Sequence, residues 1–223
     1  MVDVHTEPDA DREADRGTRE DRQAVQRETK ADRTRARILD AAAEVLSEQG
    51  YLARLSDIAD RAGMKAGSLY YHFGSREDLV AEILHRGIET SFDHVRAAID
   101  ALPGDATPIE RVAAAIRAHT MSILQISAYA SAQARIVAQV PPAVAQDHQR
   151  DQRRYGAYWQ QLLEAAQQAG DISADTDLFV TRMLAFGAMN WIAEWSALAG
   201  RRSVDAIADQ AVRTILDGIR TRL

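Results

Sequence analysis

Proline, the residue that interrupts helices most strongly, is nearly absent from this chain of 223 residues. After residue 33 it occurs only at positions 103, 108, 141 and 142. No run alternates β-branched residues with polar ones, so strands have no sequence signal, whereas the long stretches between the prolines can continue as helices. The expected fold class is therefore all-α, with glycine ending helices at Gly50, Gly63 and Gly170.

Composition excludes several classes of protein. The chain has no cysteine, which excludes disulfides, thiolate zinc sites and a cysteine nucleophile. No apolar run reaches the ~18 residues of a membrane span, and the charged N-terminus is no secretory signal. We therefore expect a cytoplasmic protein with no membrane partner. The six histidines include no pair spaced four apart on one helix, so no metal site and no cofactor are expected.

The charge is distributed unevenly. The whole chain has a net charge of −6, which by itself argues against nucleic acid binding. Residues 1–29 hold a net charge of −4 with few apolar side chains, and they are expected to form a disordered charged tail. Residues 30–86 are neutral overall and begin with a basic cluster, so a local DNA-binding surface remains possible. That cluster comprises Lys30, Arg33, Arg35 and Arg37.

Apolar periodicity and capping residues divide the rest of the chain into helices. The expected ranges are about 34–49, 56–62, 66–72, 76–100, 109–127, a shorter helix to 139, 144–169, 177–199 and 204–222. Ser75 and Ser203 are expected to cap two of these helices.

Two of the short helices, joined at Ala62-Gly63-Met64, have the dimensions of a helix-turn-helix. Glycine permits the sharp turn. The two helices are expected to pack together through four apolar residues: Leu55, Ile58, Leu69 and Phe73. The second helix then presents short polar and aromatic side chains outward, namely Lys65, Ala66, Ser68, Tyr71 and His72. Such a helix fits the major groove of DNA. Gly67 weakens the helix but permits a close approach to DNA.

Residues 58–79, IADRAGMKAGSLYYHFGSREDL, resemble the signature of the TetR family of bacterial transcription regulators. The resemblance implies a three-helix DNA-binding domain over residues 30–78. It also implies a larger helical bundle over 79–223 that binds a ligand and dimerises.

The family resemblance also implies residue roles. Tyr70, His72 and Arg76 match positions that contact phosphates. Lys65, Ala66, Ser68 and Tyr71 match positions that read bases or the adjacent backbone, with Gly67 between them. The DNA backbone beside this site would be contacted by Arg33, Arg35 and Arg37. The sequence departs from the family pattern at Arg54, where a Ser or Thr cap is usual, so Ser56 is expected to cap. The pair Lys65-Ala66 is also unusual, which puts the operator sequence in doubt.

The helix expected over 177–199 is apolar nearly all round, since only Arg182 and Glu194 are charged between Leu178 and Ala199. Such a helix is buried on both sides, and it could pair with the last helix across a two-fold axis. The alternative is a core helix of a monomer. The expected interface residues of a homodimer are Phe179, Phe186, Trp195, Ile207, Ala211 and Ile215.

The same region suggests a cavity for a small molecule, because aromatic surfaces, small residues and isolated polar groups occur together. The candidate ligand residues are His119, Ser122, Gln125, Tyr129, Tyr155, Tyr158, Trp159, Met183, Gly187, Asn190 and Trp191. The alternative is an ordinary aromatic core. The spacing of Asn190, Trp191 and Trp195 is similar to that in family members that sense CoA thioesters or hydrophobic acids. The charged stretch 147–154 is either a solvated face or a contact for an anionic head group.

These features together indicate a ligand-responsive, DNA-binding transcriptional regulator. The favoured form is a repressor that leaves a palindromic double-stranded operator when an acyl-CoA or a hydrophobic acid binds. The chain has no Gly-x-Ser-x-Gly elbow, phosphate loop or convincing carboxylate pair, so an enzyme is not expected. Two alternatives remain: a ligand-dependent activator, and a helical binding protein whose helix-turn-helix is structural or contacts a protein partner.

Overall fold

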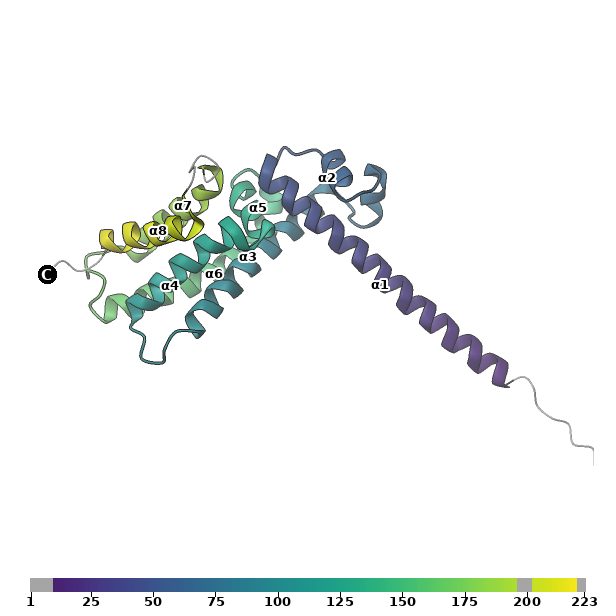
Figure 1. The fold of residues 1–223 in the computed structure, drawn as a ribbon, viewed down its shortest axis with the longest axis horizontal. Coiled ribbons are helices and arrows are strands. Elements are labelled where there is room, and N and C mark those ends of the chain that lie inside the picture. Colours follow the sequence, from purple (N-terminus) through teal and green to yellow (C-terminus); the bar gives the residue numbers. More distant parts are fainter. Residues whose placement is uncertain (1–9, 196–201, 220–223) are drawn as a thin grey trace, which may run out of the picture.

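The computed structural model describes residues 10–195 and 202–219, which contain helical segments and no β-strand (Figure 1). This result confirms the all-α prediction. The segments are α1 (Ala10–Gln49), α2 (Leu55–Arg61), the 3₁₀ helix η1 (Ala66–Tyr71), α3 (Arg76–Asp100), α4 (Pro108–Met121), the π-helical turn η2 (Ser122–Ile126), α5 (Ala128–Ile136), α6 (Pro142–Gln168), α7 (Leu178–Trp195) and α8 (Val204–Ile219). No helix within the described ranges is long and apolar enough to cross a membrane.

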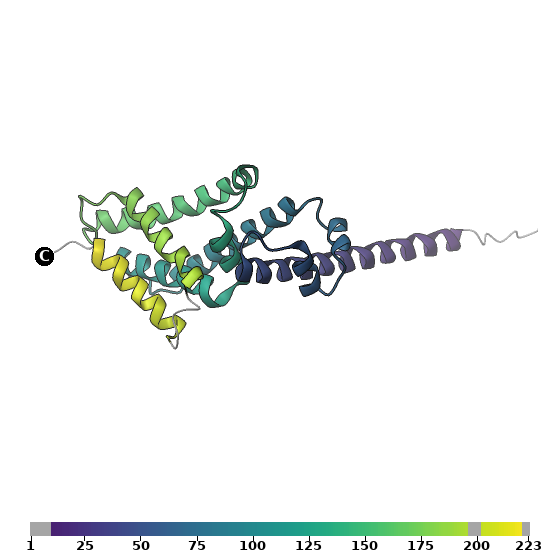
Figure 2. The ribbon, with the colours of Figure 1, turned by 90° about the horizontal axis from the view of Figure 1, so that it is seen from above.

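The first helix is longer than the sequence predicted. Helix α1 begins at Ala10 instead of residue 34, and its N-terminal half projects away from the body of the molecule (Figures 1 and 2). This segment lacks proline and places opposite charges four residues apart, as in Asp15 and Arg19, a spacing that supports a solvated helix. A helix that projects into solvent needs no apolar face. Residues 1–9 of the expected tail lie outside the described part of the chain.

The helix starts predicted from Ser75 and Ser203 agree with the structure. The Ser75 hydroxyl accepts a hydrogen bond from the Asp78 amide at 3.0 Å, and the Ser203 hydroxyl accepts one from the Ala206 amide at 3.2 Å. Thr107 and Glu110 form a capping box before α4. The predicted ends near 199 and 222 fall outside the described residues.

The helix expected over 109–127 is interrupted. Helix α4 ends at Met121, η2 follows, and Ser127 caps the separate helix α5. Inside this break, Ser122 is buried, and its hydroxyl lies 3.1 Å from that of Ser91 on α3. A π-helical turn of this kind inserts an extra residue and often marks a functional region.

Two apolar cores share helix α3. The first joins α1, α2, η1 and the start of α3 to α5, with contributions such as Leu46, Ile58, Leu84 and Ile136. The second joins the rest of α3 to α4, α6, α7 and α8. Helix α5 therefore packs on the N-terminal helices, so the two parts of the chain are not separated by a flexible linker.

Helices α3 and α5 approach each other closely at Gly87. A Cβ atom placed there would lie 2.4 Å from the carbonyl oxygen of Tyr129 and 2.4 Å from Cβ of Gln133. Real side chains do not tolerate such distances, so only glycine fits between these two helices.

We predict that Gly87→Ala destabilises the fold, because the added methyl group must push α3 and α5 apart. Overpacking of this kind costs about 1–3 kcal/mol, and each kcal/mol lowers the Tm of a chain of this size by about 2–4 °C. Thermal denaturation followed by circular dichroism measures the effect. Gly218→Ala is the matched control, since a Cβ atom at Gly218 would meet nothing within 4 Å. Equal Tm values for the two variants would contradict the prediction.

Candidate functional site

The helix-turn-helix has the predicted turn. Gly63 has a φ of +66°, which a residue with a side chain rarely adopts. The Met64 amide donates to the Ala59 carbonyl at 2.9 Å and closes the end of α2. The Arg61 guanidinium then ties α2 to α1 through Glu44 and Glu48, at 2.7 and 2.8 Å. Hydrogen bonds to these two carboxylates raise the pKa of Arg61.

The second element of the motif is a 3₁₀ helix, η1, where the sequence predicted an ordinary helix. Leu69 is buried and anchors it, whereas Tyr70 and Tyr71 are 58% and 91% exposed. Lys65, Ala66 and Gly67 are exposed as well. A Cβ atom at Gly67 would meet nothing within 4 Å, so no contact inside the chain requires glycine there. The surface is therefore open for a close approach to another molecule.

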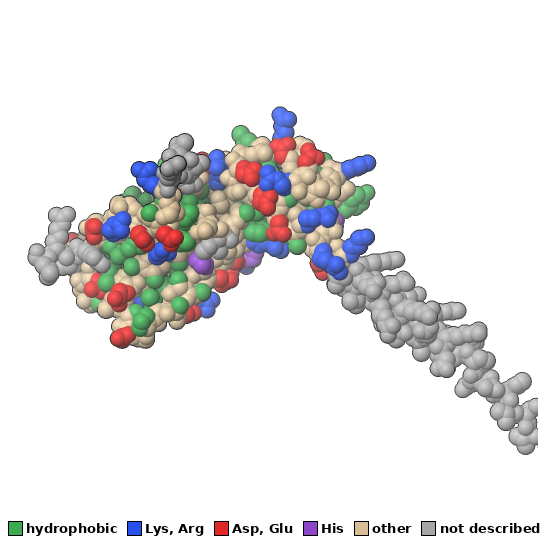
Figure 3. All heavy atoms as spheres, viewed as in Figure 1, with side chains coloured by type: hydrophobic (Ala, Val, Ile, Leu, Met, Phe, Trp, Pro, Cys, Tyr) green, Lys and Arg blue, Asp and Glu red, His purple; other side chains and the backbone are tan. Residues whose placement is uncertain are grey.

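Basic side chains flank η1 (Figure 3). Arg37 is exposed, whereas Arg35 lies 4.4 Å above the Phe73 ring and 3.6 Å from Glu82. The remaining predicted DNA contacts, Arg33, Ser68 and His72, are exposed or half-buried on the same domain. The structure thus gathers the predicted polar residues at one end of the molecule.

The structure gives Arg76 contacts within the chain and corrects the predicted cap at Ser56. Arg76 donates to the carbonyl oxygens of Tyr51 and Ala53 and stacks 4.3 Å from the Tyr51 ring centroid, so it holds the loop between α1 and α2. Ser56 is not the N-cap of α2. Arg54 holds that position without a side-chain hydrogen bond, and Ser56 lies within the first turn. Helix α2 therefore begins at Leu55, one residue before Ser56.

The larger part of the chain contains a cavity of about 250 Å³ between α3, α4, α5, α6 and α7. Its lining includes four predicted ligand residues: His119, Tyr155, Met183 and Asn190. The other lining residues are Ile88, Ser91, Gln133, Gln152, Gly156, Arg182 and Phe186. The predicted cavity therefore exists, with a different polar lining.

His119 organises one wall of the cavity. Its Nε2 atom lies 3.2 Å from the amide oxygen of Asn190, which can only accept, so Nε2 carries the proton. Its Nδ1 atom, 3.0 Å from the Tyr155 hydroxyl, then accepts from that group. This network gives the partly buried Asn190 a hydrogen-bond partner. Burial lowers the pKa of His119 to about 4, so the ring is neutral at pH 7.

Arg182 brings a positive charge to the cavity. Its guanidinium donates to the Gly156 carbonyl and lies 5.5 Å from the Phe179 ring centroid. Its buried Nε atom has no hydrogen-bond partner among residues 10–195 and 202–219, which is costly for a charged group. Arg182 also lines an adjoining open groove of about 550 Å³ with Gln149 and Arg153. The sequence could have pointed to Arg182 as a cavity residue, because it is one of only two charged residues in the apolar stretch from Leu178 to Ala199.

Seven predicted ligand residues do not line the cavity. Tyr129 instead donates to Asp40 on α1 at 2.6 Å, and Tyr158 packs on Phe92. Ser122 bonds to cavity-lining Ser91, and Trp159 belongs to the core. The others are exposed: Gln125, Gly187 and Trp191. Sequence spacing alone could not separate the inner and outer faces of these helices.

Helix α7 also has an exposed apolar face. Phe179, Val180, Leu184 and Trp191 are between 47% and 69% exposed. Of the predicted interface residues, only Phe179 belongs to this face. Phe186 turns inward against His119, while Trp195 and Ile207 pack together between α7 and α8. Ala211 and Ile215 are partly buried against the larger core.

The chain matches two family models. Residues 38–83 match the model described as bacterial regulatory proteins of the tetR family, and residues 105–219 match the model of a tetracyclin repressor-like C-terminal domain. The transcriptional repressor KstR2 of Rhodococcus jostii is 31% identical over 191 residues. The match covers 83% of this chain and 90% of that protein.

Two solved structures have a similar fold. The ketosteroid transcriptional regulator KstR2 of Mycobacterium tuberculosis aligns with a TM-score of 0.68 at 25% identity, covering 84% of this chain and 95% of that one. AibR, solved with isovaleryl coenzyme A and operator DNA, aligns with a TM-score of 0.70 at 23% identity, covering 81% and 97%. With the motif, the two domains and these relatives in agreement, the chain belongs to the TetR family of bacterial transcription regulators.

Proposed function

We propose that this regulator is a repressor that leaves its operator when an amphipathic acid binds in the cavity of its C-terminal domain. The ligand class is a hydrophobic acid or its CoA thioester. The observation that carries this proposal is Arg182, whose buried Nε atom lacks a partner beside an apolar cavity. The protein would meet its DNA in the bacterial cytoplasm.

The two hollows fit the two ends of such a ligand. The cavity is lined by groups such as Ile88, Met183 and Phe186 and by a neutral His119, which suits an apolar chain or ring. The adjoining groove contains Arg153 and Arg182, which suits a carboxylate or phosphate. AibR binds isovaleryl coenzyme A in its solved complex, and this ligand has the same division into apolar and anionic parts.

A homodimer would present two copies of η1 to one operator. The apolar face of α7 is too extensive to be expected on a monomer, and a two-fold partner would cover it. The interface we propose is therefore centred on Phe179, Val180, Leu184 and Trp191. A two-fold dimer reads a palindromic site whose halves are about 34 Å apart, one turn of DNA.

Helix α5 provides a short path between ligand and DNA. Gln133 lines the cavity, and Tyr129, one turn earlier on the same helix, donates to Asp40 of α1. Helix α3 runs beside α5 and carries Ile88 and Ser91 to the cavity. A ligand that binds one arrangement of these helices better than another shifts the population toward it. A coupling of about 1–3 kcal/mol would change operator affinity some 5- to 150-fold.

We predict that Lys65→Ala and Tyr71→Ala each weaken operator binding without changing Tm, because both side chains are exposed. Each lost contact is worth about 1–3 kcal/mol, and loss of a lysine–phosphate contact lowers the salt slope by about 1. Titrating labelled upstream DNA at several salt concentrations measures both effects. Arg76→Ala is the contrasting variant, since it should lower Tm as well as affinity. Full operator affinity in Lys65→Ala and Tyr71→Ala would exclude η1 as the DNA-reading element.

We predict that Arg182→Gln weakens binding of hydrophobic acids and acyl-CoA thioesters by about tenfold or more, since a hydrogen bond to a charged group is worth about 1.5–3 kcal/mol. Calorimetry with a panel of acyl-CoAs and the corresponding amides measures this effect. The matched control is Arg117→Gln, because Arg117 pairs with Asp205 and Asp209 and does not line the cavity. Equal weakening in both variants, or none in either, would refute the anionic-ligand assignment.

We predict that Tyr129→Phe reduces the effect of ligand on operator affinity, because it removes the hydroxyl that bonds α5 to Asp40. Residues along such a path modulate coupling by about 0.5–2 kcal/mol. The measured quantity is the ratio of operator Kd values with and without saturating ligand. Tyr158→Phe, at a hydroxyl remote from α1, should keep the ratio of the parent protein. If Tyr129→Phe has the same ratio of Kd values as the parent protein, the contact between α5 and Asp40 does not couple the cavity to the DNA.

A further inference from the structure

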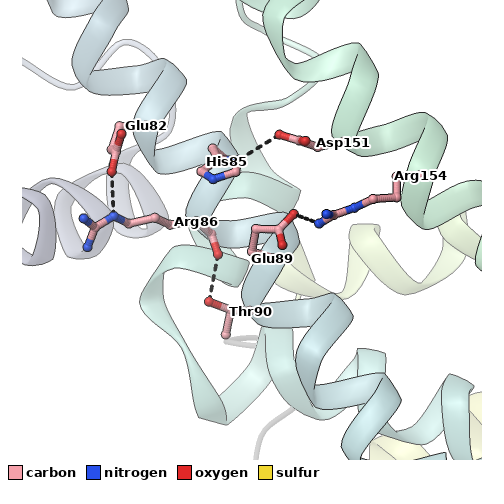
Figure 4. Close-up of polar contacts among 7 residues, drawn as sticks. All are labelled: Glu82, His85, Arg86, Glu89, Thr90, Asp151 and Arg154. Atoms are coloured by element: carbon pink, nitrogen blue, oxygen red, sulfur yellow. Dashed lines mark hydrogen bonds and ion pairs between the residues drawn. The ribbon is translucent and has the colours of Figure 1, made fainter.

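Helices α3 and α6 bring together three side chains that can bind a metal (Figure 4). His85 and Glu89 lie four residues apart on α3, and Asp151 lies on α6. One ligand atom from each residue lies within 4.8 Å of the other two. The closest pair is His85 Nδ1 and Asp151 Oδ2, at 2.8 Å. These residues line neither hollow described above.

A fourth side chain at this place lacks any partner. His148 precedes Asp151 by three residues on α6 and is only 4% exposed, yet neither of its ring nitrogens makes a hydrogen bond within the described part of the chain. Residues three apart lie on the same face of a helix, so His148 lies on the face of α6 that carries Asp151. Buried imidazole nitrogens normally have a partner. This histidine is therefore an unexplained ligand group beside the cluster.

The contacts within the cluster keep the donor atoms in position. Asp151 is held by His85, and Glu89 is held by Arg154. Arg86 bonds to Glu82, one turn earlier on α3, and its side chain extends away from Asp151 (Figure 4). The Arg154 side chain is 54% exposed, so it can move into solvent and release Glu89. An ion would then replace the hydrogen bond between His85 and Asp151.

We propose that His85, Glu89 and Asp151 bind a divalent transition-metal ion of the zinc type, with His148 as the fourth ligand. Imidazole together with carboxylates suits Zn²⁺ and its neighbours, whereas Mg²⁺ and Ca²⁺ prefer oxygen ligands alone. Ligands spaced three and four residues apart on facing helices are also how metal sites are built inside helical bundles. Histidine spacing along the sequence does not reveal this site, because His85 and His148 lie on different helices.

Such an ion would couple two regions of the regulator. Helix α3 extends from the helix-turn-helix, and Gln152 and Tyr155 of α6 line the cavity. A metal held by both helices would fix their separation, whichever small molecule the cavity binds. The proposal does not depend on the identity of that ligand.

The test is a titration of tag-free, full-length protein with Zn²⁺ by calorimetry, and with Co²⁺ by visible absorption. We expect one ion per chain. The variants His85→Gln and Asp151→Asn each remove one ligand, and we expect affinity to fall by about 10- to 100-fold, the range known for changes around metal sites. His148→Gln should weaken binding and alter the Co²⁺ spectrum.

The matched control is His94→Gln, because His94 lies on the same helix α3 and outside the cluster. It should bind Zn²⁺ as the parent protein does. Melting curves in metal-free buffer identify any variant that fails to fold, and such a variant is replaced by His85→Asn or Asp151→Ser. No binding below about 100 µM Zn²⁺ would overturn the proposal, since structural and catalytic sites bind far more tightly. The proposal would also be overturned if His94→Gln lowered the affinity for Zn²⁺ as much as His85→Gln does.

Discussion

The close contact between α3 and α5 at Gly87 is the constraint on which the rest of this structure depends. With no side chain at this position, the Tyr129 carbonyl and the Gln133 side chain can approach the backbone of α3. Helix α5 can then pack on α1 and α3 together, which merges the helix-turn-helix and part of the larger domain into one apolar core. A packed core transmits displacement better than a flexible linker does. The regulator can therefore respond as one body to events in the cavity.

The polar groups of the larger domain are arranged around two basic side chains, the buried His119 and the partly buried Arg182. His119 is neutral because burial lowers its pKa, and it serves as a hydrogen-bonding link between Tyr155 and Asn190. Arg182 donates to the Gly156 carbonyl, yet its Nε atom has no hydrogen-bond partner among the described residues. The cavity therefore has one end that suits an apolar group and one end that suits an anion, which supports the proposed class of ligand more directly than the cavity volume does.

Local sequence patterns predicted the fold well where the signal was short-range. The caps Ser75 and Ser203 and the turn at Gly63 depend on neighbouring residues, and the structure confirms all three. Predictions failed where the outcome depended on distant partners. The helix expected over 109–127 divides at η2, and α1 starts at Ala10 because a solvated helix needs no apolar face.

The sequence by itself determined the all-α class and the helix-turn-helix joined at Gly63, because turn chemistry and helical periodicity are encoded locally. The family followed from the resemblance of residues 58–79 to its signature. It also indicated that the helix around Asn190 combines apolar and polar groups. Only the tertiary structure decided which face of that helix turns inward: Phe186 and Asn190 reach the cavity, whereas Trp191 faces outward. The same holds for His85 and Asp151, which meet because α3 and α6 pack together. Contacts between residues far apart in the chain depend on how helices pack, and no local pattern specifies that packing.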